Sequence, residues 1–175
     1  MIKIVQKENG VLRQMAKEVP KEDITKPKIK KVLKDMADAL KSQDDGVAIA
    51  APQIGISLRV FIVSGKIFSP YFKRGEPLPK GEKTPKNIIF INPKISKLSK
   101  EKNWVPEGCL SVRWLYGKTH RGVKATIQAF DENGKKFIRG GSGLLAQIFQ
   151  HETDHLNGIL FIDHAKDIKE EKPKN

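Results

Sequence analysis

The sequence contains one cysteine and no apolar run that approaches the length of a membrane-spanning helix. A single cysteine excludes an internal disulfide, which fits a protein of a reducing compartment. The first residues lack the long apolar stretch of a secretory signal. We therefore expect a cytoplasmic protein that has no membrane partner.

Acidic side chains are scarce relative to basic ones, since 20 aspartates and glutamates stand against 33 lysines and arginines, for a net charge of +13. The excess is concentrated in residues 46–106, which hold 11 basic and 3 acidic residues. Such a surface attracts phosphate groups, so these are the residues that we expect to dock on a ribosome if the protein has that partner. A basic face that is merely solvated explains the charge equally well, and no aromatic-interleaved RNA-binding pattern accompanies it.

The chain has 175 residues, of which 38% are hydrophobic and 30% charged, so it is long enough for one domain with a core of its own. We predict a single domain over residues 1–165. Residues 166–175 are charged and carry no periodic pattern, and we expect them to form a disordered tail.

Helical spacing of apolar residues marks two main segments. Residues 28–41 predict an amphipathic helix of structural role, which Thr25 would cap. A last helix follows Ser142, which would cap its start, and Gly158 stands where a helix C-cap is expected. Residues 11–19 predict a further short helix before a proline.

Strand patterns occupy residues 58–63 and 88–95, which are separated by a long loop over 65–87 that is rich in glycine, proline and lysine. Residues 123–130 and 135–139 flank an Asp-Glu-Asn-Gly turn and predict a hairpin. Because strands and helices do not alternate, the class is α+β. We expect antiparallel sheets packed around the last helix, with an amphipathic helix nearer the N-terminus.

The last helix carries a His-Glu-Thr-Asp-His motif. His151 and His155 lie one turn apart on one helix face, so both imidazoles reach a single metal ion. Glu152 is rotated by about 100° from His151, which places its carboxylate beside such an ion, near a bound water. A polar helix with two surface histidines is the alternative, but a chance match to this motif is rare in a chain with four histidines. We therefore predict a metal site.

A catalytic metal site of this kind needs a third protein ligand and an open position for water. One class of metalloprotease continues the motif to a third histidine, but Phe161 stands at that position. Another class uses a later glutamate, for which the chain offers only Glu170 and Glu171 in its tail, and His164 follows the helix stop. We prefer Cys109, because the glycine before it lets the backbone approach an ion. The alternative for a lone cysteine is a buried structural role. One thiolate and two imidazoles suit iron, zinc, nickel or cobalt.

Three blocks of the sequence resemble the motifs of the peptide deformylase family. They are Gly-Val-Ala-Ile-Ala-Ala-Pro-Gln-Ile-Gly at 46–55, Glu-Gly-Cys-Leu-Ser at 107–111 and Gln-His-Glu-Thr-Asp-His at 150–155. Their order and spacing also match the family, and the likeness extends over most of residues 1–165. The resemblance implies an enzyme that removes the formyl group from the N-terminal formylmethionine of nascent polypeptides and releases formate.

The resemblance also implies chemical roles for single residues. Three residues would bind the metal, which in the family is often ferrous iron: Cys109, His151 and His155. Zinc, nickel and cobalt are compatible with the same ligands. The metal would activate a water, and Glu152 would take its proton and pass it to the leaving amine. We further hypothesise that Glu107 pairs with Arg121 and braces the second motif.

The oxyanion of the reaction would be stabilised by the Gln53 side-chain amide and the Leu110 backbone N–H. The nascent peptide would pair as an added strand with three residues, Gly46, Val47 and Ala48. One face of the last helix would line the pocket for the methionine side chain, through Leu144, Gln147 and Ile148. The alternatives for these positions are a solvated glutamine and ordinary core residues.

Four features depart from the family pattern and bear on side-chain preference and efficiency. Ala48 replaces the usual glycine, so a methyl group crowds the substrate strand, and Gln147 makes the pocket less apolar. Arg113 and Trp114 replace the usual Pro-Gly, and the loop over 65–87 is longer than in many relatives. None of these is a proposed metal ligand or catalytic residue.

Two other functions stay open from the residues alone. An H-E-x-x-H endopeptidase would need a third ligand other than Cys109, such as His164. A non-enzymatic basic protein on ribosomal or other RNA would hold its metal in a closed four-ligand site, without a position for water.

Overall fold

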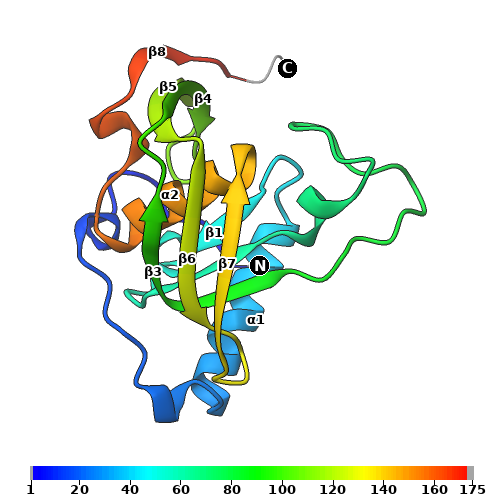
Figure 1. Ribbon diagram of the computed structural model, residues 1–175, viewed down its shortest axis with the longest axis vertical. Helices are drawn as coiled ribbons and strands as arrows, with labels where there is room; N and C mark the ends of the chain where they lie inside the picture. Colours follow the sequence, from blue (N-terminus) through cyan, green and yellow to red (C-terminus); the bar gives the residue numbers. More distant parts are fainter. Residues whose placement is uncertain (1, 173–175) are drawn as a thin grey trace.

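The computed structural model describes residues 2–172 and has the predicted α+β class, with strands that form two antiparallel sheets. The first sheet has the order β1-β2-β3-β6-β7, with β1 at Ala48–Ala50, β2 at Val60–Val63, β3 at Ile88–Leu98, β6 at Lys124–Phe130 and β7 at Lys136–Ser142. The second has the order β4-β5-β8, with β4 at Lys102–Gly108, β5 at Leu115–Gly122 and β8 at Lys166–Glu170. The helices are α1 at Pro27–Lys41 and α2 at Gly143–Leu156, and short 3₁₀ helices lie at Gly10–Arg13, Lys21–Asp23, Ala51–Ile54, Gly65–Phe68 and Phe161–Asp163. Both sheets contact α2, which lies behind β3 and β6 in Figure 1.

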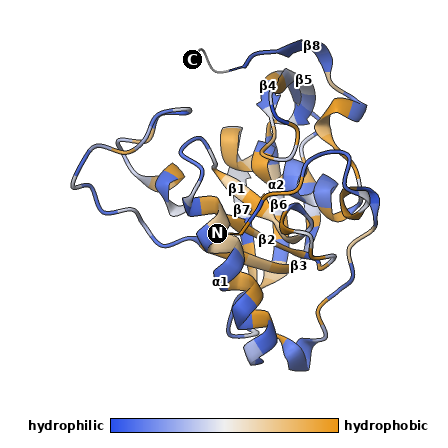
Figure 2. Ribbon diagram, turned by 180° about the vertical axis from the view of Figure 1, so that it is seen from behind, coloured by the Kyte–Doolittle hydropathy of each residue, from blue (hydrophilic) through white to orange (hydrophobic). Residues whose placement is uncertain are grey.

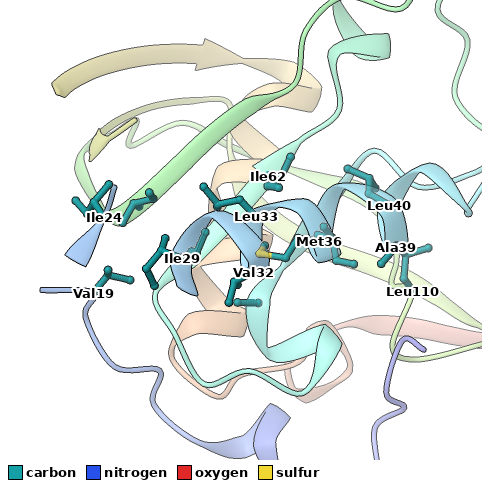
Figure 3. Close-up of a cluster of buried hydrophobic side chains, with 14 residues drawn as sticks. Val19, Ile24, Ile29, Val32, Leu33, Met36, Ala39, Leu40, Ile62 and Leu110 are labelled. Carbon is teal, nitrogen blue, oxygen red and sulfur yellow. The ribbon is translucent and has the colours of Figure 1, made fainter. Parts of the chain in front are cut away.

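The amphipathic helix predicted over 28–41 is confirmed as α1. Its apolar stripe is buried in a cluster that also holds Ile62 of β2 and Leu110, as Figure 3 shows. The cap residue is Lys26, which makes no side-chain capping bond, so the prediction that Thr25 caps the helix is wrong. The cluster matters for the site because it anchors the Leu110 side chain, and with it the second motif, to the body of the protein.

The five-stranded sheet is covered on both faces, because successive side chains of a strand point to opposite sides. Along β2, Val60 and Ile62 belong to the cluster with α1, whereas Phe61 and Val63 belong to the cluster with α2. Phe61 stacks on Phe90 of β3 with ring centroids 4.6 Å apart. In Figure 2 the hydrophobic residues gather in these inner elements. This packing fixes α2 against the sheet and leaves its polar side to meet the second sheet.

The hairpin and the last helix follow the predictions closely. β6 and β7 pair on either side of the predicted turn, where Gly134 has a φ of +76°. α2 begins directly after Ser142, although the Ser142 side chain makes no capping bond. Gly158 follows the helix end with a φ of +75°, and a Cβ at this position would lie 2.7 Å from the Arg13 carbonyl oxygen. Only glycine therefore lets the chain turn here against the N-terminal segment.

The short helix predicted over 11–19 is wrong for most of its length. A 3₁₀ helix covers Gly10–Arg13, and the chain is extended beyond it. The N–H groups that a longer helix would use are bonded elsewhere, since Ala16 donates to the Leu156 carbonyl at 2.9 Å and Lys17 donates to the Ser57 carbonyl at 3.1 Å. Tertiary pairing outweighs local helix propensity in this segment.

The tail predicted to be disordered over 166–175 forms a strand in its first half. β8 pairs antiparallel with β5, and Lys118 of β5 lies 3.3 Å from Asp167. The prediction failed because β8 pairs with a sheet edge through backbone N–H and C=O groups, which requires no apolar pattern in the strand. All residues of β8 are exposed, and Ile168 is the one apolar residue among them, so no apolar pattern marks the strand, which is mostly hydrophilic in Figure 2. Residues 173–175 lie outside the described residues.

The loop predicted over 65–87 contains a 3₁₀ helix at Gly65–Phe68, and in both views the rest extends away from the two sheets (Figures 1 and 2). Its two ends are tied together, since the Gly65 N–H donates to the Asn87 side chain at 2.9 Å. Within residues 2–172 the structure has no helix with both the length and the apolar character that a bilayer crossing requires.

Candidate metal centre and active site

Helix α2 and the turn after β4 bring three ligand-type side chains together. The ligand atoms of Cys109, His151 and His155 all lie within 4.8 Å of one another, and Cys109 Sγ is 3.2 Å from His155 Nε2. His164 is not part of this group, since its Nε2 lies 3.4 Å from a carboxylate oxygen of Asp154. The structure therefore places the preferred third ligand, and not its rival, beside the two histidines.

Glu107, near the end of β4, orients His151. Its carboxylate is 3% exposed and accepts a hydrogen bond from His151 Nδ1 at 2.7 Å, which leaves Nε2 of that ring as the free nitrogen. The same carboxylate accepts from Arg121 at 2.6 and 3.1 Å, from Thr119 Oγ1 at 2.7 Å and from Gln147 Nε2 at 3.0 Å. Burial alone would raise the pKa of Glu107, but the hydrogen bonds and charges of His151 and Arg121 hold it well below its usual range. The predicted pair of Glu107 and Arg121 is confirmed.

The two histidines differ in proton affinity. Burial favours the neutral form of both rings, but the Cys109 thiol and the Glu107 carboxylate raise the pKa of His151 well above its usual value. Burial, reinforced by the charge of His151, lowers the pKa of His155 well below its usual value. His155 is therefore neutral at physiological pH, which is the form in which an imidazole can bind a metal ion, whereas His151 would have to lose a proton first.

Glu152 lies on the wall of a cavity that Cys109 and His151 also line, with 3% of its surface exposed. Burial, with the charges of Glu107 and Asp154 adding to it, raises the pKa of Glu152 to about 7. Its Oε2 is buried and has no hydrogen-bond partner in the described part of the chain. A carboxyl group in this state can take up and release a proton near neutral pH.

A divalent metal ion fits this group of residues. One thiolate and two imidazoles form a donor set that iron, zinc, nickel and cobalt accept, and three protein ligands leave a position for water. The buried Glu152 Oε2 needs a donor, which a water beside such an ion would supply. Cys109, His151 and His155 are the residues that would hold the ion.

Gln53 and Leu110, the expected oxyanion donors, both line the cavity. The Gln53 side chain is fixed at Oε1, which accepts from the Ala50 N–H at 2.9 Å. Its Nε2 lies 3.2 Å from Ser111 Oγ and 3.5 Å from Cys109 Sγ. The Leu110 N–H has no hydrogen-bond acceptor within residues 2–172.

The cavity has a volume of about 310 Å³ and reaches from the ligand group to the surface. All six expected substrate residues line it, namely Gly46, Val47, Ala48, Leu144, Gln147 and Ile148. The lining residues that were not predicted to have a site role include Asp45, Arg74, Arg113 and Tyr116. Arg113 was visible in the sequence only as a departure from a motif, and Arg74 lies in a loop without any pattern.

Comparison with known proteins decides the family. A model of the polypeptide deformylase family matches residues 1–171. The chain belongs to the peptide deformylase family. Peptide deformylase 2 of Clostridium acetobutylicum is 39% identical over 156 residues, which cover 89% of each chain. The peptide deformylase of Desulforudis audaxviator is 37% identical over 172 residues, which cover 98% of each chain.

Solved deformylase structures resemble this fold over nearly its whole length. The class I type b peptide deformylase from Acinetobacter baumannii, in a crystal structure with Met-Ala-Ser bound, has a TM-score of 0.79 and 29% identity, and the match covers 94% of this chain and 99% of that one. The enzyme from Synechococcus elongatus in complex with actinonin has a TM-score of 0.79 and 30% identity, with 95% of this chain and 81% of that one covered. This deformylase is thus an enzyme that removes N-formyl groups, with a Cys-His-His group that is consistent with a single metal site.

Proposed function

We propose that this deformylase acts on the N-terminal formylmethionine of nascent polypeptides, that formate is released, and that Glu152 is the general acid/base. One observation carries the proposal, which is the buried Glu152 carboxyl with a pKa of about 7 on the wall of the cavity that Cys109 and His151 also line. The relative from A. baumannii was crystallised with Met-Ala-Ser, which supports a methionyl peptide as the substrate.

Cys109, His151 and His155 would hold the metal ion, which by family analogy is ferrous iron, and zinc, nickel or cobalt would suit the same donors. A bound divalent ion supplies Lewis-acid polarisation of the attacking water and of the formyl carbonyl. Glu107 contributes by keeping the proton of His151 on Nδ1, so that the lone pair of Nε2 stays available to bind the metal ion.

Glu152 would carry the proton through both halves of the reaction. It takes a proton from the attacking water while the water oxygen forms a bond to the formyl carbon. The oxyanion that develops on the formyl oxygen would meet the Gln53 amide and the Leu110 N–H, which has no acceptor in the described part of the chain. As the carbon–nitrogen bond breaks, Glu152 returns the proton to the leaving α-amino nitrogen. The products are formate and a peptide with a free N-terminus.

The substrate peptide would bind as an additional strand along Gly46, Val47 and Ala48. β1 is the edge strand of its sheet, and among residues 2–172 its one strand partner is β2, so its other edge offers N–H and C=O groups to a peptide. The methionine side chain would enter the part of the cavity lined by Leu144, Gln147 and Ile148 on α2. Two of these residues are apolar, as a thioether side chain requires.

The site of action would be the cytoplasm, where nascent chains emerge, with the basic residues 46–106 turned to the ribosome. The support for this docking is the charge of that segment, since 11 basic residues stand against 3 acidic ones. Binding to purified ribosomes should then weaken steeply as the salt concentration rises. Salt-independent binding, or none at low salt, would exclude an electrostatic docking face.

The reaction is tested with the protein reconstituted with iron or nickel under anaerobic conditions and given formyl-Met-Ala-Ser. We expect formate and free amino groups to appear in equal amounts, while acetyl-Met-Ala-Ser and unblocked peptides stay intact. Cleavage of internal peptide bonds without formate would instead assign the site to an endopeptidase. His164→Ala should keep the metal content, and Cys109→Ala should lose it.

A further inference from the structure

Three charged side chains line the cavity beyond the residues described above, and two of them neutralise each other. Arg113 donates to both carboxylate oxygens of Asp45, at 2.5 and 2.9 Å, and to Gln43 Oε1 at 3.0 Å. This guanidinium is held in a bidentate pair, and the pair adds no net charge to the cavity wall.

Arg74 is the third charge, and it has no acidic partner. It comes from the long loop between the 3₁₀ helix Gly65–Phe68 and β3. Its hydrogen bond within the described chain runs from Nη2 to the Pro106 carbonyl at 3.1 Å, and no aspartate or glutamate of residues 2–172 forms an ion pair with it. The charge of the Glu107 carboxylate acts on Arg74, but this carboxylate is already bonded to Arg121 and His151. Arg74 therefore gives the cavity an uncompensated positive charge.

The position of Arg74 is fixed relative to the substrate site. The Pro106 carbonyl that holds it also accepts from Gln147 Nε2 at 2.9 Å, and Gln147 lines the expected methionine pocket. One N–H is engaged in this contact, which leaves the others free for a bidentate contact with a carboxylate. Arg74 is exposed to solvent on the wall of the cavity, so a peptide that enters the cavity can reach its guanidinium.

We propose that Arg74 is a specificity residue that binds a carboxylate on the second or third residue of the formylated peptide. The enzyme then deformylates acidic nascent chains in preference to basic ones. The inference rests on the proposed function, because it assumes that the peptide runs through this cavity. The long loop would then select peptides by the charge of their second or third residue, whereas the residues that hold the metal and those that line the methionine pocket act only on the formylmethionine.

The test compares kcat/KM for formyl-Met-Asp-Ser-amide and formyl-Met-Ala-Asp-amide with the peptides that carry lysine at the same positions. Amidated peptides are used because a free C-terminal carboxylate would itself bind Arg74. We expect the acidic peptide to be preferred about tenfold at one of the two positions, mainly through KM, and the preference to shrink at high salt. Arg74→Ala should bring the ratio close to one, and Arg74→Lys should retain part of it. Lys73→Ala removes an equal charge from the adjacent position, outside the cavity lining, and should leave the ratio unchanged.

The outcomes separate this inference from the function on which it rests. Deformylation of all peptides without an acidic preference would overturn the role of Arg74 and leave the proposed function intact. A preference that survives in Arg74→Ala, or that Lys73→Ala abolishes equally, would also overturn it, since the long-range charge of the surface would then be the cause. Failure to deformylate any formylmethionyl peptide would overturn the proposed function and this inference with it.

Discussion

Replacing Glu107 by glutamine tests the network that orients His151. The carboxylate is buried and accepts five hydrogen bonds, from His151, Arg121, Thr119 and Gln147, with two of them from Arg121. Glutamine has the same shape but no charge, and its amide nitrogen is a donor that would face other donors. Arg121, whose side chain is 7% exposed, would keep only Asp154, at 2.7 Å, as an acidic partner.

The expected cost follows from the loss of a buried ion pair, which is typically about 3–5 kcal/mol. Because Asp154 still pairs with Arg121, we expect the lower end, about 3 kcal/mol. For a chain of this length, that corresponds to a fall in the thermal midpoint of roughly 6–12 °C. Loss of the negative charge that orients His151 Nδ1 should weaken metal binding by about 10–100-fold.

The assay is thermal unfolding of the metal-free protein, combined with a competition titration against a chelator for metal affinity. Glu101→Gln is the matched control, since Glu101 is exposed and should shift stability by less than about 0.5 kcal/mol. The reasoning would be refuted if Glu107→Gln kept both the thermal midpoint and the metal affinity of the unmodified protein.

Three further predictions concern pH and the pocket. As the pH rises from 4.5 to 7, the metal-free protein should lose about 3 kcal/mol of its free energy of unfolding relative to Glu152→Gln. The reason is that Glu152 ionises near its usual pKa of 4.5 in the unfolded chain but only near a pKa of about 7 in the folded chain. Urea titrations at each pH measure the difference, and a difference that stays constant with pH would contradict this prediction. Acid should release the metal between pH 7 and pH 4, because protons compete with the metal ion for its thiolate and imidazole ligands, His151 above all. The metal content is measured after gel filtration at each pH. Unchanged occupancy would exclude the thiolate–imidazole ligand set. Gln147→Leu should lower KM for formyl-Met-Ala-Ser, because the pocket becomes more apolar. The same substitution should reduce the free energy of unfolding by about 1–3 kcal/mol, because Glu107 and the Pro106 carbonyl lose a hydrogen-bond donor. Kinetics and thermal unfolding measure the two effects, and a higher KM would show that Gln147 assists substrate binding.

Periodic patterns in the sequence predicted the elements that pack through their own apolar faces. α1, the hairpin of β6 and β7, and α2 with its metal-ligand motif are of this kind. Cys109 was identifiable because the chain has a single cysteine within a recognisable motif. These features depend on local spacing, which the linear sequence displays.

The elements that the sequence did not reveal depend on tertiary partners. β5 buries Thr119 and Arg121, which serve the Glu107 carboxylate, so its inward side chains are polar and no apolar alternation marks the strand. β8 forms because it meets the free edge of β5. Arg74 lies on the cavity wall through a hydrogen bond to the Pro106 carbonyl of another element, and nothing in the neighbouring sequence indicates this.

The most direct test of the central claim is formate release by Glu152→Ala, with metal content measured on the same sample. We expect one metal ion per chain in both proteins, because Glu152 is not among the three ligand-type residues, and a loss of turnover by orders of magnitude in the variant. Formate release at the unmodified rate by fully loaded Glu152→Ala would contradict the assignment of Glu152 as the general acid/base.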